Sequence, residues 1–87
     1  MVVLEKIKAG AKIVDVRSPG EFQGGAYPGA VNIPVQELDR RSGELRKDQP
    51  VVVYCASGMR SASAERLLRA KGFVDVVNGG GLAQMPR

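Results

Sequence analysis

The stretch Val51-Val52-Val53-Tyr54-Cys55-Ala56-Ser57-Gly58-Met59-Arg60-Ser61 decides the fold that we predict for this chain. Its first five residues form a continuous run of apolar, mostly β-branched side chains, which is typical of a strand buried on both faces of a sheet. Residues 61–71 then carry apolar side chains at helical spacing, and Gly72 is suited to end a helix there. A buried strand followed by a short loop and an amphipathic helix indicates a parallel α/β sheet.

The rest of the chain continues this alternation of strands and helices. We expect helices over 2–9 and 35–41, strands over 12–16, 30–33 and 73–77, a loop over 21–29, a glycine turn over 78–81 and the start of a helix within 82–87. The pattern predicts a small three-layer α/β domain with a mainly parallel sheet flanked by short helices. Functional residues of such sheets lie at the carboxyl ends of the strands, where this sequence places Asp15 and Arg17, Asn32, and Cys55.

Length and composition are those of one globular domain. The chain has 87 residues, of which 44% are hydrophobic and 25% charged, so we expect a single domain over 1–87. It has no apolar run long enough for a transmembrane helix and no secretory signal, so we expect a cytoplasmic protein without a membrane partner. The net charge is +4, but the basic residues are scattered and aromatic residues are few. We therefore expect no nucleic-acid partner, and we expect a monomer.

The sequence contains no His and a single Cys, Cys55. One thiol cannot form an intramolecular disulfide or, without His, a Cys/His zinc site, so we expect no bound metal. The run Gly79-Gly80-Gly81 lacks the spacing of a dinucleotide-binding fingerprint, and we expect no cofactor. A Ser-His-Asp triad and a Cys–His pair are both excluded. If Cys55 is a nucleophile, groups other than imidazole must activate it.

The loop that follows the predicted central strand can provide that activation. Cys55 ends the strand and Arg60 enters the next helix. A tight loop between them can turn backbone N–H groups toward the sulfur, while the helix dipole and the Arg60 charge add positive potential. All three effects favour the thiolate, so we predict a lowered pKa for Cys55. The alternative is an inert core cysteine, because free cysteines are often buried, but the position at the sheet edge favours the nucleophile.

Four stretches of the chain resemble signatures of the rhodanese-like domain family. They are Val14–Phe22, similar to D-V-R-x-x-x-E-F; Pro28–Pro34, similar to P-G-A-x-N-I-P; Val53–Ser61, similar to the active-site loop C-x-x-G-x-R-S; and Val77–Gly81, similar to the C-terminal glycine turn. The resemblance covers residues 12–82 in order. Two positions depart from it: Ala26 stands where the family often has His, and Leu82 replaces a usual aromatic residue.

The resemblance implies a sulfurtransferase that works through a persulfide on Cys55. The thiolate would attack the outer sulfur of a small anionic donor, which is thiosulfate, a polysulfide or a persulfide. Cyanide or a thiol, including a thiol of a partner protein, would then remove that sulfur. The loop that binds substrate and persulfide would comprise Ala56, Ser57, Gly58, Met59 and Arg60. Because Ala56 and Ser57 carry no charge, we expect thiosulfate to be a poorer donor than a polysulfide or a small persulfide.

Four further residues are predicted to support this loop: Asp15, Arg17, Glu21 and Ser61. We expect Asp15 to hydrogen-bond backbone near the loop, and Arg17 and Glu21 to form a partly buried ion pair that fixes the segment after the first strand. We also expect Arg60, helped by Arg17, to pair with the anionic group of the donor.

Two other functions remain open for a chain of this kind. One is a non-catalytic rhodanese-like binding module, although such modules often lose the cysteine that this chain retains. The other is a phosphatase or arsenate reductase, which in resembling proteins uses C-x5-R. Here Cys55 and Arg60 form C-x4-R. The shorter loop favours a pocket for one extra sulfur atom over one for a tetrahedral oxyanion.

Overall fold

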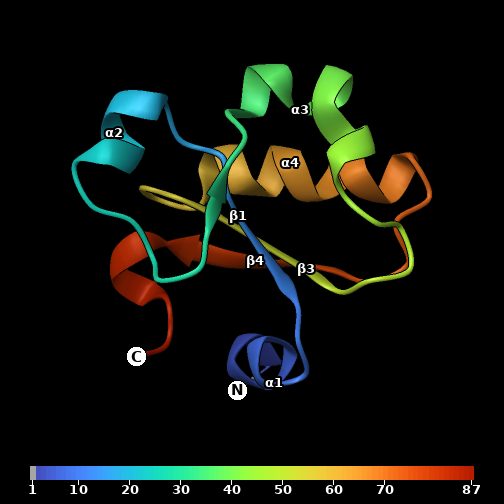
Figure 1. The fold of residues 1–87 in the computed structure, drawn as a ribbon, viewed down its shortest axis with the longest axis horizontal. Coiled ribbons are helices and arrows are strands. Elements are labelled where there is room, and N and C mark those ends of the chain that lie inside the picture. The colour runs from blue at the N-terminus through green and yellow to red at the C-terminus, as the bar shows by residue number, and fades with distance from the viewer. Residues whose placement is uncertain (1) are drawn as a thin grey trace.

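A computed structural model describes residues 2–87, and a fully parallel four-stranded sheet lies at its centre (Figure 1). The strands are β1 (Lys12–Asp15), β2 (Val31–Asn32), β3 (Val51–Cys55) and β4 (Val76–Gly81), in the spatial order β2-β1-β3-β4. Asp15 lies opposite Tyr54, and Cys55 lies opposite Gly81. The carboxyl ends of the two central strands therefore meet at one edge of the sheet.

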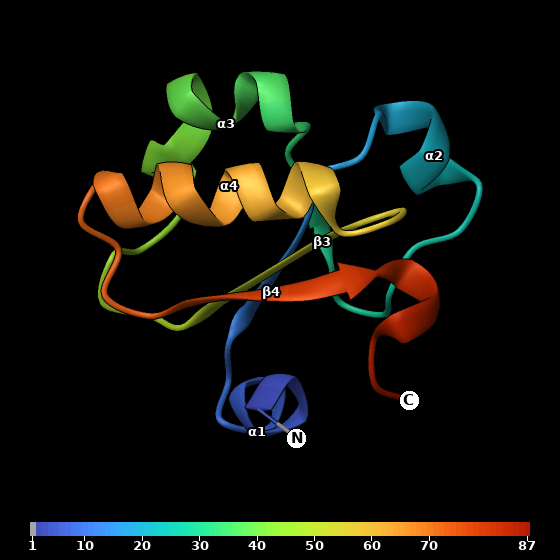
Figure 2. The same ribbon diagram turned by 180° about the vertical axis from the view of Figure 1, so that it is seen from behind.

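Helices cover both faces of this sheet (Figure 2). On one face lie α3 (Val35–Arg41) and α4 (Met59–Ala70), and on the other lie α1 (Val2–Lys8) and the 3₁₀ helix η2 (Leu82–Gln84). A second 3₁₀ helix, η1 (Ser42–Glu44), extends α3, and α2 (Pro19–Gln23) follows β1. The prediction of a three-layer α/β domain with a parallel sheet is confirmed. None of the helices within residues 2–87 is long and apolar enough to cross a lipid bilayer.

The central strand β3 supplies side chains to both halves of the core. Val51, Val53 and Cys55 pack on the side of α3 and α4, whereas Val52 and Tyr54 pack on the side of α1 and η2. All five are buried. Because both faces of β3 are covered, polar and apolar residues do not alternate along the strand, and its sequence is a continuous apolar run.

The segment after β1 contains a helix where we predicted a loop over 21–29. Ser18 is the N-cap of α2: its hydroxyl accepts from the Glu21 N–H, and the Glu21 carboxylate accepts from the Ser18 N–H. Pro19 occupies the first turn, where its missing N–H costs no hydrogen bond. The S-x-x-E capping box was the signal for this helix. The loop prediction is wrong for residues 21–23.

Two other elements, α4 and β4, have boundaries that differ from the prediction by two or more residues. α4 begins at Met59 rather than at residue 61. The Phe73 N–H donates to the Leu68 carbonyl at 3.1 Å, so it closes the end of α4 instead of joining the sheet. β4 accordingly begins at Val76 and continues through the glycines to Gly81. The predicted strand is confirmed at residues 76–77, whereas its start at residue 73 and the glycine turn over 78–81 are wrong.

The glycines stay in β4 because the strand passes very close to the loop after β3. The register changes from Val53 opposite Asn78 to Cys55 opposite Gly81, so β4 contains one extra residue there, as in a β-bulge. A Cβ on Gly81 would overlap the Ala56 carbonyl oxygen and lie 3.0 Å from its carbon. Only glycine permits this approach of two backbones.

We expect Gly81→Ala to destabilise the protein by about 1–3 kcal/mol, because the added methyl group must push two backbone segments apart. Urea unfolding followed by circular dichroism measures the change. Gly43→Ala is the matched control, since a Cβ on Gly43 meets nothing within 4 Å. A Gly81→Ala protein as stable as the control would show that the approach of β4 to Ala56 is not a packing constraint.

Candidate functional site

Cys55 is the last residue of β3, and its side chain is fully buried on the α4 side of the sheet. Its Sγ accepts a hydrogen bond from the Gly58 N–H at 3.0 Å and lies 3.4 Å from the Ser61 Oγ. Gly58 has φ +98° and is the N-cap of α4. This left-handed conformation, which glycine adopts at little cost, reverses the chain and directs the Gly58 N–H at the sulfur. We call residues 55–60 the Cys55 loop.

Hydrogen bonds at the sulfur make the thiol acidic. Burial raises the pKa of Cys55, but donation from the Ser61 hydroxyl and from the backbone N–H groups of Ser61, Gly58 and Ser57 outweighs burial and lowers the pKa to about 7. An ordinary cysteine has a pKa of about 8.5. The predicted lowering of the pKa is confirmed, and the groups that favour the thiolate include no histidine.

Asn78 belongs to the site, and we did not predict it from the sequence. Its Oδ1 accepts from the Ser61 hydroxyl at 2.7 Å and from the Gly80 N–H at 2.8 Å, and its Nδ2 donates to the Gly58 carbonyl at 3.2 Å. A hydroxyl has one hydrogen, so Ser61 donates either to Asn78 or to the thiolate. Asn78 therefore competes with Cys55 for that hydrogen. The sequence signal that could have identified Asn78 is an amide side chain directly after the two valines that end a predicted strand.

The ion pairs near the loop differ from those predicted. Arg60 forms a bidentate pair with Glu21, with Nη1–Oε1 at 2.8 Å and Nη2–Oε2 at 3.0 Å. Arg17 instead pairs with Asp15, with Nη2–Oδ2 at 2.7 Å. The predicted Arg17–Glu21 pair is wrong, because α2 turns Glu21 toward the start of α4. The Arg60 hydrogen bonds lower the pKa of Glu21 to about 2, so the pair stays ionised at neutral pH.

Asp15 is the centre of a buried scaffold beside the loop. Its carboxylate accepts from the Arg17 side chain and backbone N–H and, at 2.9 Å, from the Tyr54 hydroxyl. The Tyr54 oxygen in turn accepts from the Tyr27 N–H at 2.9 Å, and Arg17 Nη2 donates to the Gly25 carbonyl at 2.8 Å. These bonds fix the segment before β2 on the sheet. The expected hydrogen bond from Asp15 to backbone is present, at the Arg17 N–H.

The remaining loop residues form an open rim over the buried sulfur. Ala56, Ser57 and Met59 are exposed, Met59 by 78%, while Gly58 and Arg60 are partly covered. The structure thus brings Cys55, Gly58 and Ser61 together at the sulfur, whereas Ala56, Ser57 and Met59 are exposed and the Arg60 side chain pairs with Glu21. Among residues 2–87 no three or more His, Cys, Asp or Glu side chains gather closely enough to hold a metal ion.

Comparison with known proteins identifies the family. The model of the rhodanese-like domain matches residues 2–83. The chain belongs to the rhodanese-like domain family. It is 43% identical to the Bacillus subtilis protein YqhL over 77 residues, which are 85% of this chain and 61% of YqhL. It is 38% identical to the Escherichia coli thiosulfate sulfurtransferase PspE over 71 residues, which are 79% of this chain and 68% of PspE.

This rhodanese-like domain also resembles solved structures over nearly its full length. The human single-domain sulfurtransferase TSTD1 superposes with a TM-score of 0.81 at 28% identity, covering 92% of this chain and 84% of TSTD1. A rhodanese from Escherichia coli, solved with anions, gives a TM-score of 0.81 at 36% identity, covering 88% of this chain and 95% of that protein. Some relatives are longer: the chain spans 36% of the putative sulfur carrier protein YrkF of Bacillus subtilis.

We expect Ser61→Ala to raise the pKa of Cys55 from about 7 to about 8, because the thiolate loses a hydrogen-bond donor that the thiol does not need. At pH 7 the thiolate fraction then falls about fivefold, and alkylation by iodoacetamide slows by the same factor. The pH dependence of alkylation measures this directly, since Cys55 is the only thiol.

Ser63→Ala is the control for this experiment, because Ser63 lies on the exposed side of the same helix. We expect its alkylation profile to match that of the unmodified protein. An unchanged midpoint in Ser61→Ala would mean that the backbone N–H groups alone stabilise the thiolate.

Proposed function

We propose that this rhodanese-like domain is a sulfurtransferase that carries sulfane sulfur as a persulfide on Cys55. One observation carries the proposal: a buried sulfur at a strand-to-helix turn, with a pKa of about 7, accepts hydrogen bonds from the loop that encloses it. A thiolate at this position is a nucleophile at neutral pH. The names of the relatives PspE and TSTD1 describe the same type of activity.

The reaction has two balanced steps. The Cys55 thiolate attacks the outer sulfur of the donor; with thiosulfate, the S–S bond of the donor breaks and sulfite leaves with its electron pair. The product is the Cys55 persulfide anion. A thiolate or cyanide then attacks the outer persulfide sulfur, takes it as a new persulfide or as thiocyanate, and releases the Cys55 thiolate. The N–H groups of the loop stabilise the anion at each stage, as an oxyanion hole does for oxygen.

The charges around the loop favour donors without a sulfonate. The only cationic side chain of the Cys55 loop, Arg60, is already neutralised by Glu21. The charge of Arg17 is likewise compensated by Asp15, which accepts from two of its three side-chain nitrogens. Ala56 and Ser57 add no charge. A polysulfide or a persulfide, which needs less positive charge than thiosulfate, is therefore the preferred donor, and a small or protein-bound thiol is the acceptor.

Intact-mass measurement tests the persulfide. After incubation with polysulfide, we expect the protein to gain the mass of one sulfur atom and to lose it on addition of cyanide. Cys55→Ser should gain nothing, and Ser57→Ala, which retains the thiol, should still gain the sulfur. A folded protein that forms no adduct with polysulfide or thiosulfate would contradict the proposal and indicate a binding module.

Glu21→Gln tests whether the ion pair limits thiosulfate use. The substitution frees Arg60 to pair with the donor sulfonate, and a glutamine at this position still completes the capping box of α2. We expect the KM for thiosulfate to fall about threefold, with the gain decreasing at high salt. Glu65→Gln, which breaks the exposed Arg69–Glu65 pair on α4, is the control and should leave the KM unchanged. An unchanged KM in Glu21→Gln would mean that Arg60 does not reach the donor.

A further inference from the structure

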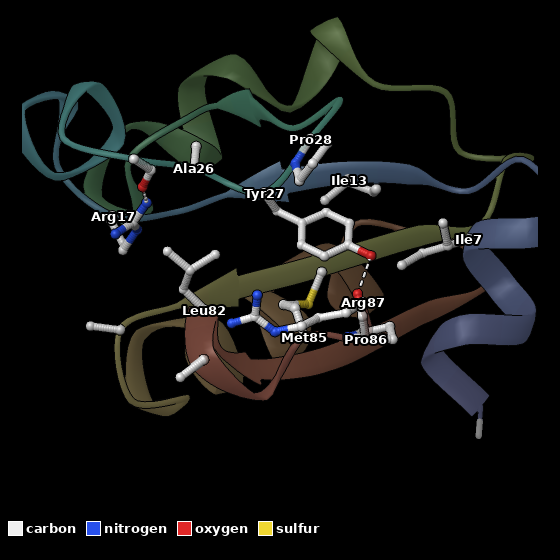
Figure 3. A pocket seen from close by; sticks show the side chains of 13 residues that line it. Ile7, Ile13, Arg17, Ala26, Tyr27, Pro28, Leu82, Met85, Pro86 and Arg87 are labelled. Atoms are coloured by element: carbon white, nitrogen blue, oxygen red, sulfur yellow. Dashed lines mark hydrogen bonds between the residues drawn. The ribbon is translucent and has the colours of Figure 1, made fainter.

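A pocket of about 960 Å³ lies on the α1 face of the sheet, opposite the face that holds the Cys55 side chain (Figure 3). Its walls are largely apolar, with Ile7 and Ile13 on one side and Leu82 and Met85 on the other. Tyr27 crosses the middle and is held there, because its hydroxyl donates to the Pro86 carbonyl. A pocket of this size and lining suits a small organic molecule.

One end of the pocket reaches the Cys55 loop. Ala56, the residue directly after Cys55, lines it together with Arg17. Arg17 and Ala56 both follow the carboxyl ends of the paired strands β1 and β3. In Figure 3 Arg17 and Ala26 lie at this end, while Ile7 lies at the other. The pocket therefore extends from the Cys55 loop to α1.

The loop end of the pocket offers a hydrogen-bond donor. Arg17 uses Nε and Nη2 to hold Asp15 and the Gly25 carbonyl. Its third nitrogen, Nη1, makes no hydrogen bond within residues 2–87. No buried side-chain nitrogen or oxygen in that part of the chain lacks a partner, so Nη1 must be accessible to solvent. An accessible guanidinium N–H at the end of an apolar pocket favours a ligand with an apolar body and an anionic end.

We propose that this pocket binds the organic part of the sulfur donor. The donor class is R–S–S⁻ or R–SO2–S⁻ with an apolar group R: the group R occupies the pocket, and the anionic sulfur end lies between Arg17 and Ala56, next to the Cys55 loop. This assignment rests on the persulfide role of Cys55. Few charges near the sulfur are unpaired, so charge alone does not select the donor. Burial of the apolar group R in the pocket supplies the binding free energy instead.

Transfer from such a donor balances without any further reagent. The Cys55 thiolate forms a bond to the outer sulfur, the bond between that sulfur and the rest of the donor breaks, and its electron pair leaves with R–S⁻ or R–SO2⁻. The products are the Cys55 persulfide anion and a thiolate or sulfinate. The leaving group carries R, so release of R empties the pocket for the acceptor.

Two thiosulfonates that differ only in R test the proposal: methanethiosulfonate and benzenethiosulfonate, assayed by thiocyanate formation with cyanide. We expect the phenyl donor to have a KM at least about tenfold lower than the methyl donor. Ala83→Phe should fill the pocket and remove this preference, because Ala83 lines it. Ala70→Phe, at the exposed end of α4, should retain the preference.

A binding measurement separates this proposal from the persulfide mechanism. In Cys55→Ser, which transfers no sulfur, titration with benzenethiosulfonate should shift the methyl NMR signals of Ile7 and Ile13, and Ala83→Phe should abolish these shifts. Equal KM values for the two donors, or no shifts in Cys55→Ser, would overturn the pocket assignment while leaving the persulfide intact. Absence of an adduct with every donor would overturn the proposed function itself.

Discussion

A negative charge on the Cys55 sulfur persists only if hydrogen-bond donors replace the water that burial removes, since an unpaired buried anion is costly. Most of the local structure follows from this requirement. β3 delivers the sulfur into the core, Gly58 turns its N–H back to 3.0 Å from Sγ, and α4 starts immediately afterwards with its own N–H groups near the sulfur. The approach of Gly81 to Ala56 keeps this turn pressed against β4. Backbone geometry thus performs the task that imidazole performs in many cysteine enzymes.

The two arginines near the Cys55 loop fix neighbouring segments of the chain more than they attract an anion. Arg60 lies in the Cys55 loop and Arg17 lies near it, yet each is paired with a carboxylate, Arg17 with Asp15 and Arg60 with Glu21. The Asp15 pair is buried, and the Tyr54 hydroxyl completes it. Such pairs orient the segments that carry them more than they add net potential. The groups that stabilise a negative charge on the sulfur are therefore the Ser61 hydroxyl and oriented backbone N–H groups, none of which titrates near neutral pH.

Sequence reasoning succeeded where the signal is local and failed where it depends on distant contacts. The β3–loop–α4 unit could be predicted, because burial on both faces and helical spacing are visible in consecutive residues. The partner of Glu21 could not, because Arg60 lies 39 residues away and the orientation of α2 decides the pairing. Asn78 was missed for the same reason: its partner Ser61 lies 17 residues away, on the helix that packs beside β4. The S-x-x-E capping box that begins α2, in contrast, was a readable local signal.

Successive side chains of β3 point to opposite faces of the sheet, and this separates the two halves of the candidate site. Tyr54 and Cys55 are consecutive, so their side chains point to opposite faces: Cys55 to the hydrogen bonds that set its pKa, and Tyr54 to the Asp15 network and the cluster that borders the pocket. The two faces meet only where the strand ends, at Ala56. The groups that hydrogen-bond the Cys55 sulfur do not line the pocket, so a substitution that changes the shape of the pocket removes none of them. Donor selection and nucleophile activation can then vary independently in this domain, because one strand supplies both from opposite sides.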